Sequence, residues 1–79
     1  MSSKTFASNI QRLQRTYSLN NTDTSYVLNT SRRTLGRIKQ ANPVYQPREE
    51  TLENIAEGFG VPTTQVTKRL YAAQIASVL

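Results

Sequence analysis

The sequence predicts an all-α fold of five helices that form one domain over residues 1–79. The chain has 79 residues, which allows one hydrophobic core and leaves little room for a second domain. Apolar residues recur at helical spacing in several segments. Asparagine, proline and glycine residues separate these segments, as expected for turns between helices. Together these three observations predict short helices that pack around a small core.

The first helix is expected over about residues 5–17. Its apolar stripe, at i, i+4, i+7 and i+11, consists of Phe6, Ile10, Leu13 and Tyr17. Arg12 and Arg15 lie off this stripe. They are therefore either solvated charges, which is the favoured interpretation, or contacts to phosphate groups.

Two short helices are expected next, over about residues 21–28 and 31–40, with a tight turn at Asn29. Asparagine suits such a turn because it tolerates the left-handed backbone conformation better than other residues with a side chain. The candidate caps are Asn20 or Asn21 for the first helix and Thr30 or Ser31 for the second.

The second of these helices is predicted to expose a basic face. With Leu35 and Ile38 pointing inward, Arg33, Arg37 and Gln40 point almost directly away from the core, and Arg32 lies on one flank. Gly36 lies between the arginines, although glycine inside a helix costs about 1 kcal/mol relative to alanine. Either the helix backbone approaches a DNA groove at Gly36, or an exposed face tolerates the glycine there.

The fourth helix is expected to begin near Pro47, after a loop over residues 41–47 that contains two prolines, and to end at Gly60. Its core stripe consists of Leu52, Ile55, Ala56 and Phe59. Acidic residues recur at i, i+4 and i+8 in Glu49, Glu53 and Glu57. A solvated face explains this row better than a metal or acid–base site, because the chain has no histidine.

Pro62 is expected to open a fifth helix over about residues 62–76. One apolar stripe of this helix consists of Val66, Leu70 and Ala73, and a displaced second stripe of Tyr71, Ile75 and Val78. The second stripe either completes the core of the monomer or forms a dimer contact. We predict the dimer contact, at Tyr71, Ile75 and Val78.

The net charge of +5 is unevenly distributed. Residues 1–48 contain eight basic residues and one acid, whereas residues 49–79 contain two basic residues and four acids. This asymmetry indicates either a face that binds polyanions or a solvated basic surface.

Several classes of function are disfavoured by composition. The chain has no cysteine and no histidine, so we expect no disulfide, no metal site, no cofactor and no enzymatic activity. No apolar run approaches the length of a membrane span, and no signal peptide is recognisable at the N-terminus. The expected location is the cytoplasm of a bacterial host cell.

Two segments resemble the lambda-repressor-like family of phage and bacterial regulators, which includes Cro-type proteins. They are residues 28–38, Leu-Asn-Thr-Ser-Arg-Arg-Thr-Leu-Gly-Arg-Ile, and residues 51–61, which contain Thr-Leu-Glu-Asn-Ile-Ala and Gly-Phe-Gly-Val. The chain departs from the family pattern at Asn29, where glycine is usual, and at Thr24 and Thr30, where larger apolar residues are usual. The resemblance implies a helix-turn-helix formed by the second and third helices.

The resemblance also implies a set of DNA contacts. By position, the base-reading residues fall on Arg32, Arg33 and Arg37, and a phosphate contact falls on Asn21. Arginine pairs bidentately with guanine, which independently suits these positions. With Gln40 added from its outward position, the candidate base contacts are Arg32, Arg33, Arg37 and Gln40. The candidate phosphate contacts are Asn20, Asn21, Thr22, Ser31, Lys39 and Arg48.

The predicted function is sequence-specific binding of double-stranded DNA by a transcriptional regulator, of the kind found among phage or prophage Cro-type repressors. The third helix would enter the major groove, and a homodimer would bind a palindromic operator. No small-molecule ligand and no membrane are expected as partners. The alternative is a helix-turn-helix module that binds proteins, as in antitoxins or adaptors. RNA binding is a weaker option, because the four tyrosines are scattered.

Overall fold

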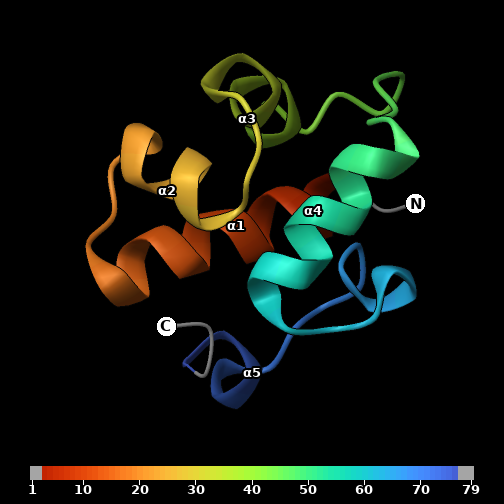
Figure 1. Cartoon of the computed structure of the whole chain (residues 1–79). Coiled ribbons are helices and arrows are strands. Elements are labelled where there is room, and N and C mark those ends of the chain that lie inside the picture. The colour runs from red at the N-terminus through yellow and green to blue at the C-terminus, as the bar shows by residue number, and fades with distance from the viewer. Residues whose placement is uncertain (1–2, 77–79) are drawn as a thin grey trace.

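The computed structural model describes residues 3–76, and these residues form five α-helices and one 3-10 turn without a strand. The elements are α1 (Ser3–Tyr17), α2 (Asn21–Val27), α3 (Arg32–Lys39), α4 (Glu49–Phe59), η1 (Thr63–Gln65) and α5 (Ala72–Ala76). Helix α1 crosses the middle of the molecule, with α3 on one side and α5 on the other (Figure 1). The predicted all-α class with five helices is confirmed.

The hydrophobic core is built around α1. Phe6, Ile10 and Leu13 are buried on this helix, at the predicted positions of its stripe. The rest of the chain contributes Leu28, directly after α2, and the helical residues Leu35, Ile38, Ile55, Ala56, Phe59 and Ile75 to the same cluster. The apolar periodicity therefore predicted correctly which face of α1, α3 and α4 turns inward.

Helix α4 approaches the end of α2 closely at Gly58. A Cβ atom added to Gly58 would lie 2.8 Å from both the Leu28 Cδ2 atom and the Val27 carbonyl oxygen. Such distances are too short for a carbon atom, so only glycine allows this approach. Gly60 follows the last residue of α4 as its C-cap. Its φ of +71° is the left-handed conformation predicted for this cap.

The continuous helix predicted over about residues 62–76 is wrong. After η1, residues 66–71 are irregular, and α5 contains only Ala72–Ala76. The buried side chain of Asn9 on α1 accounts for this. Its Nδ2 atom donates to the carbonyl oxygens of Val66 (3.0 Å) and Lys68 (2.8 Å), and its Oδ1 atom accepts from the Leu70 N–H (3.2 Å). Because these backbone groups bond to Asn9, they do not take part in a helical ladder.

The prediction that Ile75 forms a dimer contact is also wrong. Ile75 is 2% exposed and belongs to the core of its own chain. The hydroxyl of Tyr17 donates to the carbonyl oxygens of Ile75 and Ala76, which fastens α5 to the end of α1. Tyr71 is 73% exposed, whereas Val78 lies outside the described residues. Of the predicted dimer residues, Tyr71 thus remains at the surface.

None of the helices within residues 3–76 is long and apolar enough to cross a membrane.

Candidate nucleic-acid interface

Helices α2 and α3 are joined by a short turn whose capping residues match the sequence prediction. Asn20 precedes α2, and its side chain accepts a hydrogen bond from the Asp23 N–H (2.7 Å). Ser31 precedes α3, and its Oγ atom accepts from the Thr34 N–H (3.1 Å). Between the two helices, Asn29 adopts the left-handed conformation with φ of +48°. The local sequence therefore defines where each helix begins and where the chain turns.

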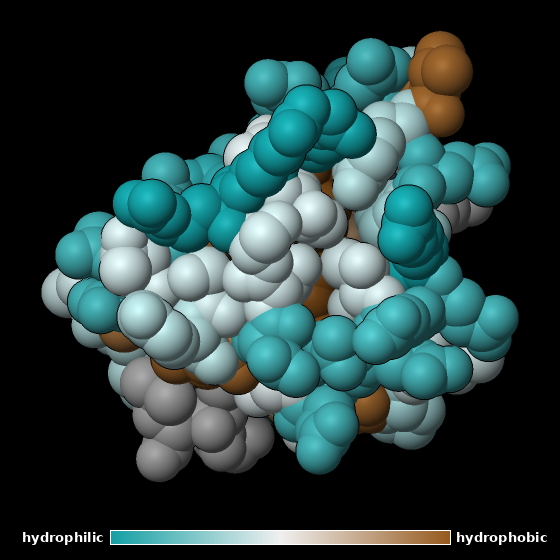
Figure 2. Space-filling view, turned by 45° about the horizontal axis from the view of Figure 1, so that its top comes forward, coloured by the Kyte–Doolittle hydropathy of each residue, from teal (hydrophilic) through white to brown (hydrophobic). Residues whose placement is uncertain are grey.

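The outer face of α3 is basic and polar. Leu35 and Ile38 are buried beneath it. The predicted base-contact residues, Arg32, Arg33, Arg37 and Gln40, are all exposed. Helix α3 lies at the top of the molecule in Figure 1, and Figure 2 is turned so that this top comes forward. Most of the residues in that view are hydrophilic. The structure thus presents these side chains on the side of α3 that faces away from the core.

Of the arginines on α3, Arg37 lies beside an aromatic ring. Its guanidinium carbon lies 5.9 Å from the centroid of the Tyr45 ring, within the range of a cation–π contact. Tyr45 follows α3 in the loop and packs partly against the core. The ring therefore supports Arg37 from one side. The contact with Arg37 was not predicted from the sequence, since it depends on the path of the loop.

Arg32 also touches a neighbouring helix. Its Nη1 atom donates to the hydroxyl of Thr22 on α2, at 3.4 Å. The side chain of Arg33 has no hydrogen bond or ion pair to another residue among residues 3–76. None of the three guanidinium groups pairs with an acid in this part of the chain. Most of their N–H donors therefore remain available to an external acceptor.

Lys39, predicted to bind phosphate, lies in a polar cluster that joins three helices. Its Nζ atom donates to Gln14 Oε1 on α1 (2.7 Å) and to Asn21 Oδ1 on α2 (3.1 Å). Gln14 Nε2 in turn donates to Asn21 Oδ1 (2.9 Å) and Thr24 Oγ1 (3.0 Å). Lys39 therefore helps to orient α3 relative to α1 and α2. An ammonium group has three donors, so one N–H remains beyond these two contacts.

Thr24 explains why a polar residue occupies an inward position on α2. It is fully buried, and its hydroxyl donates to the Asn20 carbonyl oxygen at 2.7 Å while accepting from Gln14. Both the donor and the acceptor function of the hydroxyl are thus satisfied, which removes most of the cost of its burial.

The remaining predicted phosphate contacts are spread over two places. Asn20, Asn21, Thr22 and Ser31 are exposed near the start of α2 and the start of α3. Arg48 is exposed at the residue before α4, where its side chain forms no capping hydrogen bond. The structure therefore groups four of these residues with α2 and α3 and places Arg48 at the neighbouring helix.

Four of the five acidic residues lie on α4, and the fifth, Asp23, is exposed on α2. Glu49, Glu53 and Glu57 are exposed on α4. Within residues 3–76, no three His, Cys, Asp or Glu side chains come together in a way that could hold a metal ion. The arginines of α3 and most of the acids thus lie on different helices.

No family model, no curated protein and no solved structure matches this chain.

Proposed function

We propose that α2 and α3 form a helix-turn-helix of the lambda-repressor-like type and that the protein binds double-stranded DNA in a sequence-specific way. The observation that carries this proposal is the outer face of α3, where Arg32, Arg33 and Arg37 are exposed and pair with no described acid. The major groove of B-DNA admits an α-helix, and arginine pairs bidentately with guanine O6 and N7. A helix with this face would therefore favour sites that contain G·C pairs.

The polar residues around the turn support the same docking. Asn21 uses its Oδ1 atom within the protein, so its amide N–H groups are available to donate to a phosphate oxygen. Thr22, Ser31 and the third donor of Lys39 can make further phosphate contacts. Such contacts position a protein on the duplex without reading its sequence. The hydrogen bonds among Lys39, Gln14 and Asn21 join α2 to α3. A phosphate contact at α2 would therefore also help to place α3 on the DNA.

The biological role that fits this site is that of a Cro-type transcriptional repressor, with two copies on a palindromic operator. The two copies of α3 would then lie in half-sites about 34 Å apart, which is one turn of B-DNA. Tyr71, exposed beside α5, is the residue through which we expect the two copies to touch. Ile75 has no part in this contact, because it is buried within its own chain.

The test begins with selection of bound sequences from random double-stranded DNA. We expect an enriched palindrome that contains G·C pairs, with half-sites one helical turn apart. Fluorescence anisotropy with the selected duplex and a scrambled duplex then measures the role of each arginine. Arg33→Ala and Arg37→Ala should each weaken binding to the selected duplex by about 1–3 kcal/mol and reduce the preference over the scrambled duplex.

The matched control is Arg69→Ala, which removes the same charge from a segment outside α2 and α3. It should preserve the preference for the selected duplex. Wild-type preference in both α3 variants would refute the groove assignment. If selection enriches no sequence and the pure protein sediments as a monomer, the protein-interaction alternative replaces the proposal.

A further inference from the structure

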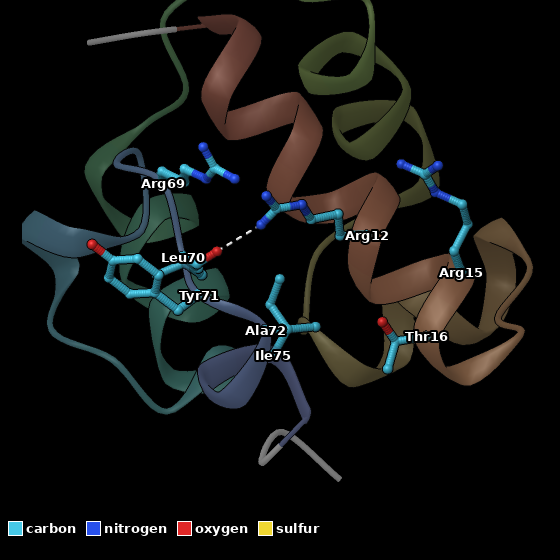
Figure 3. A pocket seen from close by; sticks show the side chains of 8 residues that line it. All are labelled: Arg12, Arg15, Thr16, Arg69, Leu70, Tyr71, Ala72 and Ile75. Carbon is cyan, nitrogen blue, oxygen red and sulfur yellow. Dashed lines mark hydrogen bonds between the residues drawn. The ribbon is translucent and has the colours of Figure 1, made fainter.

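A cavity outside α2 and α3 combines positive charge with an apolar floor. Its volume is about 500 Å³, and it lies between the second half of α1 and the segment that leads into α5 (Figure 3). The side chains around it belong to Arg12, Arg15, Thr16, Arg69, Leu70, Tyr71, Ala72 and Ile75. Cavities that bind small molecules in proteins usually measure about 300–1,000 Å³, so this one is large enough for a small ligand.

Three arginines from two separate segments surround this cavity. Arg12 and Arg15 come from α1, and Arg69 comes from the irregular segment after η1. In Figure 3 the guanidinium groups of Arg12 and Arg69 point toward each other across the opening. No acidic residue lines the cavity, and none of the three arginines forms an ion pair within residues 3–76. The like charges therefore repel one another, and a bound anion would relieve that repulsion.

One of these arginines is held in place by the fold. Arg12 is half-buried, and its Nη1 atom donates to the Leu70 carbonyl oxygen at 2.6 Å (Figure 3). The buried amide of Asn9 fixes the same segment by accepting from the Leu70 N–H. The position of Arg12 is thus set before any ligand arrives, and its other N–H groups remain able to bind a carboxylate or phosphate oxygen.

The basic end of the cavity continues into a second hollow of about 240 Å³. The two hollows share Arg12 and Arg69, and the second one adds Lys4 and the polar side chain of Ser8. A negatively charged group between Arg12 and Arg69 would therefore meet further donors on its outer side. No acid lines the second hollow either.

The opposite end of the cavity is apolar. Leu70, Ala72 and Ile75 line this end; Ala72 is exposed, whereas Leu70 and Ile75 leave only 1% and 2% of their surface accessible. The ring of Tyr71 points away from the arginines of α1 (Figure 3). An inorganic ion would leave this end unused. A ligand that has an apolar body as well as a charged head would fill both ends.

We propose that this cavity binds a small organic anion, with a phosphate or carboxylate head between Arg12 and Arg69 and an apolar body against Ala72 and Ile75. The sequence analysis predicted no small-molecule ligand. The lining residues are up to 63 positions apart, and the fold brings them together. The cavity shares Tyr71 with the proposed dimer contact but no residue with α3, since α5 and α3 lie on opposite sides of α1 (Figure 1).

Titration of the full chain with phenyl phosphate, benzoate and inorganic phosphate tests the proposal. Binding is followed through the backbone amide shifts in ¹H–¹⁵N NMR spectra and by calorimetry. We expect phenyl phosphate or benzoate to shift the amides of residues 12–16 and 69–75, and whichever binds more tightly identifies the head group. Inorganic phosphate should bind about tenfold more weakly than phenyl phosphate, because it lacks the apolar body.

Variants distinguish a built site from general attraction to a basic protein. Arg69→Gln replaces an exposed side chain, so the variant should fold, and it should weaken binding about tenfold through the loss of a charge-assisted hydrogen bond to the head group. Arg33→Gln removes the same charge from α3 and should leave the affinity unchanged. Arg12 is not replaced in this test because it also holds the Leu70 carbonyl group.

Three results would overturn the proposal. One is the absence of shifts at residues 12–16 and 69–75 with all three probes. Another is equal affinity for inorganic phosphate and phenyl phosphate, which would show that the apolar end takes no part. The last is an equal loss of affinity in Arg33→Gln, which would show that the probe responds to net charge alone.

Discussion

Replacement of Gly36 by alanine separates the stability of α3 from its proposed approach to DNA. Gly36 lies within α3, on the partly exposed side that also carries Arg33 and Arg37. A Cβ atom added at this position would meet no other atom within 4 Å. Nothing inside the protein therefore requires a glycine here.

The expected gain in stability follows from helix propensity. Alanine is favoured over glycine inside a helix by about 1 kcal/mol, and no clash opposes this gain at Gly36. For a domain of this size, 1 kcal/mol raises the melting temperature by about 4–8 °C. The new methyl group should at the same time push the helix backbone away from the floor of the groove. An overpacked contact costs about 1–3 kcal/mol, so specific DNA affinity should fall about 5- to 150-fold.

Thermal unfolding followed by circular dichroism measures the first effect, and anisotropy with the selected duplex measures the second. Gly58→Ala is the matched control, because its Cβ atom would lie 2.8 Å from Leu28 Cδ2 and from the Val27 carbonyl oxygen. This control should be destabilised by about 1–3 kcal/mol. Wild-type affinity in Gly36→Ala would refute close approach of the α3 backbone to DNA, and a lower melting temperature would refute the open surroundings of Gly36.

Three further substitutions probe single contacts. Asn9→Ala leaves the backbone groups that Asn9 binds without a partner, so urea unfolding should show a loss of about 3 kcal/mol; a loss below about 1 kcal/mol would contradict this role. Tyr45→Ala removes the ring beside Arg37 and should reduce specific DNA affinity severalfold, whereas Tyr45→Phe should retain it; equal affinities in the two variants would argue against the cation–π contact. Ser31→Ala removes the cap of α3 and should cost about 1 kcal/mol in thermal unfolding, most of which Ser31→Asp should restore; no difference between the two would show that the cap is unimportant.

The features that the sequence predicted correctly depend on residues close together in the chain. Asn20 and Ser31 cap amides three residues ahead, and Asn29 turns the chain by its own backbone conformation. The apolar stripes of α1 and α4 depend on spacings of three and four residues. Because these preferences are local, they can be recognised without knowledge of the fold.

Asn9 shows where the local pattern was insufficient. It stands at i+3 from Phe6, so it completes the buried face of α1 and could have been recognised as a buried polar residue. Its partners could not have been recognised, because they lie 57 to 61 positions away in the sequence. In place of the predicted long helix, the structure has η1, an irregular segment whose backbone bonds to Asn9, and the short α5.

The sequence by itself therefore determined the helical class, the turn between α2 and α3, and the basic outer face of α3. Only the tertiary structure decided that Ile75 completes the core, that Lys39 joins three helices, and that Arg12 and Arg69 share a cavity. The physical reason is that helical periodicity specifies the face on which a side chain lies. Which other segment packs against that face depends on residues far away in the sequence. The spacing of apolar residues within one helix does not specify that segment.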